Sequence, residues 1–505
     1  MRLRLNLIAV LLCLVAPVAR ADVGNGLAIT DPGVLRALET RSTHGLGLAQ
    51  LLASAHAAPI PNDALFALPA MIPIRAALDD AFTRYLADHQ KHQPRVSIGV
   101  GPGHDVQLFD RAMLTSPGAR FVLAGIVNRM DRAFVAPDTC GEIRLIYRLT
   151  GLDAGTTPPR LPMTLNLVLR AKEPKDTSVT CADLARRWLD AASFAGTGTA
   201  LVDRLVTSDG PLATVKASDI DRIETNLQIA HRPKSDTQEF RTDYLQTVFR
   251  FDANAKQFRE VPMENQIDRD RLLADAALGR EFRDWLLEPD NLRAFDRGTV
   301  LIPEKFLATS SLSSTPVGFA PSSLQPEFGP MAADGKGKGV FSERDVIAAL
   351  ESTAAQGGAL ENIRSPAGFA RRLNDITCGG CHQIRGIGGF HFPGADTLAE
   401  QSTQGTVPAS PHFLGDQVRR RDIVMALRDG KAPDFSRGFS DRPQTRGSHD
   451  LAGSPLLDGW GATCYRPKQK GAADKSFASW ICAEGLACQQ TGADASSAIG
   501  MCFVK

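Results

Sequence analysis

Gly141-Glu-Ile-Arg-Leu-Ile-Tyr-Arg-Leu149 is a strand-like stretch, because polar and apolar residues alternate along part of it. Residues 162–170, Pro-Met-Thr-Leu-Asn-Leu-Val-Leu-Arg, share this pattern, and residues 120–127 form a third β-rich run. The partial alternation predicts that one face of the sheet is covered. Residues 244–251 and 257–261 flank a polar turn, which predicts a β-hairpin.

Helical spacing of apolar residues occurs around and after these strands. It covers residues 74–89, 180–195, 268–287, 343–355 and 416–428. Residues 22–62 are rich in Ala, Leu and Gly and show no clear core pattern. The predicted fold class is α+β, with a mixed α/β N-terminal domain, a helical segment and a small disulfide-rich C-terminal tail.

Composition excludes several classes of protein. The 505 residues are 43% hydrophobic and 22% charged, which is typical of globular domains and not of collagen-like, disordered or multi-spanning membrane proteins. The formal net charge of +1 argues against electrostatic binding of nucleic acid. We therefore expect no nucleic-acid partner.

The N-terminus has the layout of a secretory signal peptide. Arg2 and Arg4 precede the apolar run of residues 5–18, and Ala19-Arg-Ala21 is a small-x-small cleavage site. The run is short for a bilayer span, and no later segment is apolar enough to cross one. An uncleaved anchor is the alternative. We expect a periplasmic or secreted protein with no membrane span after cleavage.

Export affects how the cysteines are interpreted. The chain after residue 21 holds eight cysteines, an even number that predicts disulfides in an oxidising compartment. Cys140 and Cys181 are expected to pair within the N-terminal domain. The four cysteines of the tail allow three connectivities, and the tail has too few apolar residues to fold without such bonds.

Cys378-Gly-Gly-Cys381-His382 is the attachment pattern of c-type haem. Two thiols three positions apart can add to the two vinyl groups of haem, and His382 can then supply the proximal iron ligand. Ser365-Pro366 begins a predicted helix that leads to this motif. A redox-active pair, a plain local disulfide or a metal site remain as alternatives.

Residues 365–433 resemble a small c-type cytochrome domain, in which a helix leads into the motif, a glycine-rich loop follows and a late helix crosses the first. The resemblance implies one covalent haem c. Arg385 follows the motif and can pair with a haem propionate. The rest of the chain resembles exported proteins of Gram-negative bacteria through Val127-Asn-Arg-Met-Asp and Cys140-Gly-Glu-Ile-Arg-Leu, but no activity comes with that resemblance. Both stretches put charges beside strands, where structural ion pairs are expected, at Arg129 and Asp131 and at Glu142 and Arg144.

The distal side of the iron departs from the family pattern. Many such domains carry Met-Pro after the late helix, whereas this chain has Ala432-Pro433. His391 is the expected distal ligand, and His412 and Met425 are the other candidates. An iron without a sixth ligand would be open to small molecules.

The sequence thus predicts a monohaem c-type cytochrome-like protein that transfers electrons or senses redox state. A haem-dependent oxidoreductase of peroxidase or oxygenase type is the second hypothesis, and a secreted binding or structural protein whose cysteine pair is a disulfide is the third. The partner would be a redox protein or a small-molecule oxidant. The predicted segments are a signal peptide (1–21), the α+β domain (22–306), a linker or long loop (307–341), a helical haem c-binding domain (342–455) and the cysteine-rich tail (456–505).

Overall fold

The computed structural model describes the chain in separate ranges, and it confirms the predicted α+β class. Among the described residues, no helix combines the length and the apolar character needed to cross a membrane. The described ranges are residues 23–24, 26–53, 59–151, 160–194, 196, 198–232, 241–315, 339–357, 360–378, 416–437, 463–466, 474–478, 480–482, 484–489 and 499–504.

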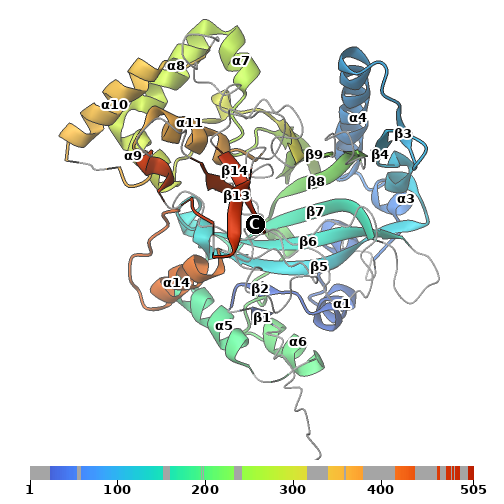
Figure 1. Cartoon of the computed structure of the whole chain (residues 1–505). Helices are drawn as coiled ribbons and strands as arrows, with labels where there is room; N and C mark the ends of the chain where they lie inside the picture. The colour runs from blue at the N-terminus through green and yellow to red at the C-terminus, as the bar shows by residue number, and fades with distance from the viewer. Residues whose placement is uncertain are drawn as a thin grey trace, which may run out of the picture.

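The main sheet is curled and almost entirely antiparallel (Figure 1). Its central strands follow the order β5-β6-β7-β8-β9, and β3 and β4 form the parallel pair. The strands are β1 (Val23–Gly24), β2 (Ala28–Ile29), β3 (Ile98–Val100), β4 (Val106–Leu108), β5 (Ala119–Arg129), β6 (Glu142–Gly151), β7 (Arg160–Arg170), β8 (Ile220–Arg232), β9 (Arg241–Asp252), β10 (Gln257–Val261) and β11 (Ser310–Thr315).

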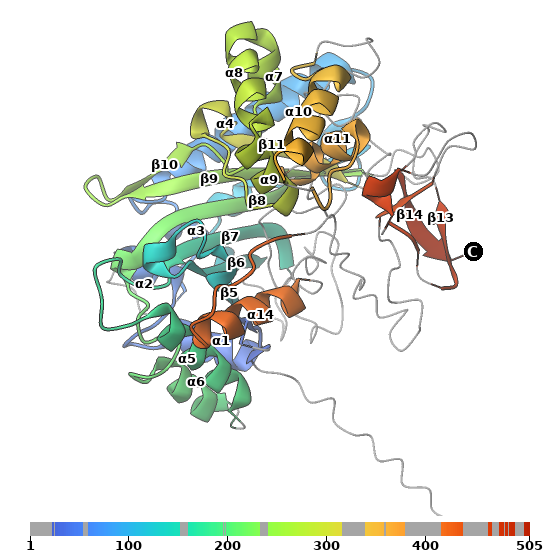
Figure 2. The same ribbon diagram turned by 90° about the vertical axis from the view of Figure 1, so that its left-hand side faces the viewer.

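The helices form two groups with the strands between them. Figure 2 shows α7, α8, α10 and α11 above the strands, and α1, α5, α6 and α14 below them. The described α-helices are α1 (Pro32–Thr40), α2 (Leu48–Ala53), α3 (Asn62–Leu65), α4 (Ile72–His92), α5 (Cys181–Ser193), α6 (Gly198–Val206), α7 (Arg269–Ala274), α8 (Ala276–Leu287), α9 (Pro289–Arg297), α10 (Glu343–Ala355), α11 (Pro366–Asp375) and α14 (Gln417–Arg428).

The sequence predicted part of these elements and misjudged three regions. The predicted strands β5, β6 and β7, the hairpin of β9 and β10, and the helices α4, α5, α10, α11 and α14 are confirmed, whereas the central strand β8 was not predicted. The linker or long loop expected over residues 307–341 is wrong at its start, because residues 310–315 pair with β9 as β11. The single helix expected over residues 268–287 is wrong: Asp275 breaks it into α7 and α8, because its carboxylate accepts hydrogen bonds from the amides of Ala277 and Leu278 and so caps a new helix. Residues 22–62 do contribute to the core, through Leu35 and Leu38 of α1 among others.

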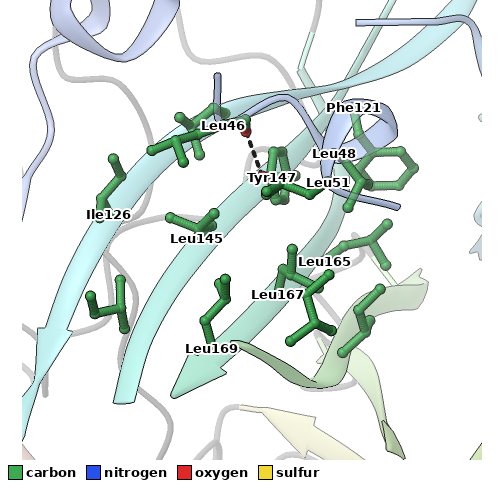
Figure 3. Packing of buried hydrophobic residues seen from close by; sticks show 14 of the residues in the cluster. Leu46, Leu48, Leu51, Phe121, Ile126, Leu145, Tyr147, Leu165, Leu167 and Leu169 are labelled. Carbon is green, nitrogen blue, oxygen red and sulfur yellow. Dashed lines mark hydrogen bonds between the residues drawn. The ribbon is translucent and has the colours of Figure 1, made fainter. Parts of the chain in front are cut away.

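One face of the sheet packs in the larger hydrophobic core. Leu145 and Tyr147 of β6 and Leu165 of β7 are fully buried there, beneath Leu48 of α2 (Figure 3). The Tyr147 hydroxyl donates a hydrogen bond of 2.6 Å to the carbonyl oxygen of Leu46. This face matches the apolar half of the alternating pattern, as the sequence predicts.

The opposite face is polar and is nevertheless buried, so the expectation of one covered face is too narrow. A single row crosses the sheet from Arg148 of β6 to Thr164 of β7, Asn226 of β8, Gln246 of β9 and Ser311 of β11. All five side chains are buried. Alternation of polar and apolar residues indicates which face each side chain takes but not whether that face meets water.

A second hydrophobic core joins parts of the chain that lie far apart in sequence. It combines residues 267–307, residues 341–376 and two aromatic side chains of the tail, Phe477 and Trp480. Phe369 of α11 sits in it at edge-to-face distances of 5.3 Å from Phe295 and 5.2 Å from Phe341, measured between ring centroids. Helix α11 is therefore held by α9, by α10 and by the tail.

Three disulfides are present in the described residues. Cys140–Cys181 joins the start of β6 to the start of α5, as expected. Cys464–Cys488 and Cys482–Cys502 close the tail, which selects one of its three connectivities. The tail folds as a three-stranded sheet of β12 (Thr463–Tyr465), β14 (Ile499–Val504) and β13 (Leu486–Gln489).

Candidate functional site

Helix α11 carries the chain to the first cysteine of the C-x-x-C-H motif. The Ser365 hydroxyl oxygen accepts a 2.9 Å hydrogen bond from the amide of Gly368, which caps the helix as Ser-Pro predicts. Phe369 and Leu373 lie one turn apart and are both buried in the second core. The helix ends at Asp375, and Cys378 follows as a half-buried residue.

The remaining predicted haem residues lie outside the described part of the chain. Cys381, His382, Arg385 and His391 all belong to residues 379–415, as does the alternative ligand His412. The structure therefore neither assembles nor separates the predicted iron ligands. Their roles stay predictions.

Helix α14 is the predicted late helix, and its packing differs from what the cytochrome resemblance implies. Its main neighbours are α5 and the 3-10 turn η2 (Met130–Arg132), and Val424 enters the larger core. Helix α11 packs instead on α10 and on the 3-10 turn η9 (Lys475–Phe477) of the tail. Met425 is half-buried on α14 beside Val424, which is consistent with a packing role.

An ion cluster, which we call the arginine cluster, lies between α14 and the end of β5. Asp131 is its centre: Arg129 Nε donates to Asp131 Oδ1 at 2.8 Å and Arg437 Nη2 donates to Oδ2 at 3.1 Å. Arg419 forms a two-pronged pair with Asp416, with N–O distances of 2.6 and 2.8 Å. Arg129 and the other arginines hold the pKa of Asp131 well below its usual range, against the opposing effect of burial. The arginine cluster consists of Arg129, Asp131, Asp416, Arg419, Arg420 and Arg437.

A second ion network lies on β6 and β8, on the polar face of the main sheet. Glu142 Oε1 lies 2.8 Å from Arg222 Nη2, and Arg144 Nη1 lies 2.8 Å from Glu224 Oε2. Arg132 pairs with Glu264 nearby. Among the described residues, three arginines here meet four carboxylates, because Arg222 also pairs with Asp221. Burial opposes ionisation of Glu142, but the arginines lower its pKa. The prediction that Glu142 and Arg144 form structural ion pairs is confirmed.

The sequence identified only part of the arginine cluster. It singled out Arg129 and Asp131 as charges beside a strand, whereas Arg419, Arg420 and Arg437 were missed. The run Arg419-Arg-Arg421 in α14 was the available signal, because successive side chains point about 100° apart and the three arginines cover more than half of the helix circumference. Arg437 follows in an extended segment that nothing in the sequence connects to Asp131.

The polar row next to these ion networks contains buried atoms without hydrogen-bond partners. Among the described residues these atoms are Thr164 Oγ1 and Asn226 Nδ2. Asn166, two positions further along β7 and outside the row, has both of its amide atoms buried without a partner as well. Gln246 is better satisfied: its amide nitrogen donates to Asn226 at 3.4 Å and its oxygen accepts from Ser313 at 3.1 Å. Buried unsatisfied polar atoms are rare in native proteins and often indicate bound water or a ligand.

Helix α11 is connected to the arginine cluster through Arg372. This fully buried side chain donates from Nη2 to the carbonyl oxygen of Arg437 at 2.7 Å and from Nε to that of Phe295 at 3.0 Å. The same Arg437 pairs with Asp131. Figure 2 shows the segment after α14 running upward from that helix towards the helices above the strands. The arrangement connects the helix before the motif to the end of the main sheet.

Comparison of the chain with protein-family models, with curated proteins and with solved structures gives no match.

Proposed function

We propose that the protein is an exported c-type cytochrome-like protein that binds one haem through Cys378 and Cys381 and transfers single electrons. The observation that carries the proposal is the C-x-x-C-H motif, placed where a capped helix, α11, delivers its first cysteine. His382 directly follows the second thiol, the position from which an imidazole serves as the proximal ligand. Haem c would supply a one-electron iron couple.

The other cysteines support this assignment. All six cysteines after residue 21 and outside the motif are joined to one another in three disulfides. Such bonds persist in oxidising compartments, where c-type haem is also attached. The donor set of two thiols and one imidazole fits haem c, and a tetrahedral zinc site would need two more ligands.

The residues of this chain would have distinct tasks in electron transfer. Phe369 and Leu373 anchor α11 in the second core, which fixes the base of the motif. Arg372 restrains the same helix from its other side through three carbonyl oxygens, those of Phe295, Asp296 and Arg437. A well-anchored helix before the motif would limit reorganisation during electron exchange with a protein partner.

A haem-dependent oxidoreductase is the second candidate, and a specific observation favours it. Ala432-Pro433 stands where many c-type cytochromes have the ligating Met-Pro, and Pro433 lies in the extended segment after α14. His391 would fill the sixth position in the carrier. Without it the iron would be open to a small-molecule oxidant such as peroxide.

Haem attachment is the decisive test. The full chain, expressed with a haem c maturation system, should keep its haem absorption after denaturation and acid–acetone extraction, because thioether bonds are covalent. Cys378→Ala with Cys381→Ala should lose it. The matched control is Cys140→Ala with Cys181→Ala, which removes a disulfide between β6 and α5 and should keep the haem. A colourless wild-type protein would reject the cytochrome proposal and favour a plain disulfide at the motif.

The electron paramagnetic resonance spectrum separates the two candidates. A low-spin signal that His391→Ala abolishes supports a bis-histidine carrier. A high-spin wild-type signal together with reaction with peroxide supports the oxidoreductase. A low-spin signal unchanged in His391→Ala excludes His391 and leaves His412 and Met425 to be tested in the same way.

A further inference from the structure

Arg420 is a buried guanidinium with unused hydrogen-bonding capacity. Arg420 is 1% exposed and lies on the face of α14 that meets η2. Its Nε lies 3.6 Å from Asp131 Oδ1 and 3.4 Å from Asp416 Oδ2, distances that give ion pairing but no hydrogen bond. Nη1 and Nη2 are also buried, and neither has a hydrogen-bond acceptor among the described residues.

The surroundings of Arg420 are rich in positive charge. Arg129, Arg419 and Arg437 share the same two carboxylates, Asp131 and Asp416, so four guanidiniums meet two acids within this part of the described structure. The pKa of Arg420 is lowered to about 9, chiefly by burial and in part by the neighbouring Arg129, although Asp131 acts against both. Burial likewise lowers the pKa of Arg437 to about 10. The second ion network, with four carboxylates for three arginines among the described residues, shows no such excess.

An anion is the ligand that such a site requires. A buried cation is costly unless it is paired and hydrogen-bonded. A metal cation would add to the positive charge, and a neutral ligand would leave it uncompensated. The guanidinium offers two parallel N–H donors, a geometry that matches the two oxygens of a carboxylate, a phosphate or a sulfate.

We propose that the arginine cluster is a binding site for the carboxylate or phosphate group of a small ligand, held by Nη1 and Nη2 of Arg420 and flanked by Arg129 and Arg437. The site lies where α14 meets the end of β5. Through Arg437 and Arg372 it is also connected to α11. Binding of an anion should therefore affect the stability of α11, the helix that precedes the motif.

The same chemistry has two sources. The oxyanion can belong to a free small molecule, or it can be a propionate of the haem, and only the second source depends on the proposed function. The two are distinguished by measuring binding both in the haem-loaded protein and in the Cys378→Ala, Cys381→Ala variant, which cannot attach haem.

The test is calorimetric titration of the full chain with inorganic sulfate and inorganic phosphate at constant ionic strength, set with chloride. We expect saturable binding of one anion. Arg420→Met should weaken binding about tenfold or more, since two charge-assisted hydrogen bonds are lost. Arg420→Lys keeps the positive charge but loses the two parallel N–H donors, so it should weaken anion binding as well. This variant provides the test if Arg420→Met fails to fold. Arg428→Gln is the matched control, an exposed arginine on the same helix, and should bind as the wild type does.

Each outcome decides the matter. Equal binding in the wild type and in the double cysteine variant supports a site for a free ligand. Binding in the cysteine variant alone supports occupation by a propionate in the haem-loaded protein. Binding by a wild type that carries no haem supports the anion site and rejects only the haem proposal. No binding in either protein, or binding that Arg420→Lys and Arg420→Met leave unchanged, overturns the proposed site.

Discussion

Arg129 and Asp131 form a two-pronged ion pair from which water is excluded. Nε and Nη2 of the arginine lie 2.8 and 3.1 Å from the two carboxylate oxygens, and both side chains are fully buried. The residues are two positions apart, at the end of β5 and in η2. The pair therefore fixes the turn that leaves the strand, and Arg437 joins it from a segment 306 residues further along the chain.

Asp131→Asn tests how strongly this carboxylate stabilises the fold. Removing one partner of a buried pair leaves several arginines with less compensation, so we expect a loss of roughly 3–5 kcal/mol in the free energy of unfolding. Urea denaturation at neutral pH measures it. Asp221→Asn is the control, because Asp221 forms a partly exposed pair with Arg222 and should cost less than about 1 kcal/mol.

The pH dependence of the same variant has a defined sign. The pKa of Asp131 is lowered in the folded state, so its contribution to stability is present above the pKa of the unfolded chain and is lost as the pH falls through the folded value. Wild-type stability should therefore fall in acid more steeply than that of Asp131→Asn. Parallel acid profiles for the two proteins would contradict the assigned role.

Cys140→Ala with Cys181→Ala tests the disulfide that lies next to the arginine cluster. The disulfide closes a separation of 41 residues and joins the start of β6 to α5, on which α14 packs. A loop of this length predicts a loss of about 2–4 kcal/mol, largely through the greater freedom of the unfolded chain. Urea denaturation checks the size of the loss. Relative to the wild type, the substitution should speed up amide hydrogen exchange more in α14 than in α11. An equal increase in both helices would show that α5 does not support α14.

Local rules predicted the elements more successfully than their assembly. Thr180 and Ser342 each begin a helix through a capping box, and both helices were predicted from residue spacing. The helix over residues 268–287 was predicted as one because its apolar spacing continues across Asp275. The carboxylate of Asp275 nevertheless competes with the helix for backbone amides, and a periodicity count does not register that competition.

Long-range pairing explains what the sequence could not predict about the site. Arg437 reaches Asp131 only because the chain after α14 runs towards α9, where the amide of Arg437 donates to the carbonyl oxygen of Arg297 at 2.6 Å. No local pattern encodes that contact. The motif alone led to the prediction for Cys378, because the proposed attachment depends on spacing within five residues. The cation-rich cluster depends on tertiary packing and becomes visible only in the fold.

Glu39→Gln tests a buried carboxyl group in the larger core. Burial raises the pKa of Glu39 to about 7, although its carboxylate accepts a 2.8 Å hydrogen bond from the amide of Leu123. Because the folded pKa is raised, this group favours the folded state below the unfolded pKa of 4.5, and that contribution is lost as the pH rises to about 7. A shift of this size corresponds to roughly 3 kcal/mol.

The glutamine variant keeps the hydrogen bond and removes the charge. We expect Glu39→Gln to be more stable than the wild type above pH 7 and to lose the decline in stability between the two pKa values. Thermal denaturation across that range measures both effects. A wild-type profile that rises with pH over the same interval, and that the variant reproduces, would contradict the raised pKa.

Trp480→Ala tests whether the tail supports α11. Ser365, the cap of α11, donates a hydrogen bond of 2.5 Å to Asp474, and Trp480 is fully buried in the second core at 5.1 Å from Phe477, measured between ring centroids. Removing residues 459–505 would leave the proposed haem-attachment residues in place, since none of them lies there.

The burial of Trp480 nevertheless predicts that the tail stabilises the fold, because truncating a buried tryptophan costs roughly 3–5 kcal/mol. Thermal unfolding of the full chain should therefore show a large loss for Trp480→Ala and almost none for Ile481→Ala, whose side chain is 68% exposed. Equal, small losses in both variants would show that the second core does not need the tail, and α11 would then depend on α9 and α10 alone.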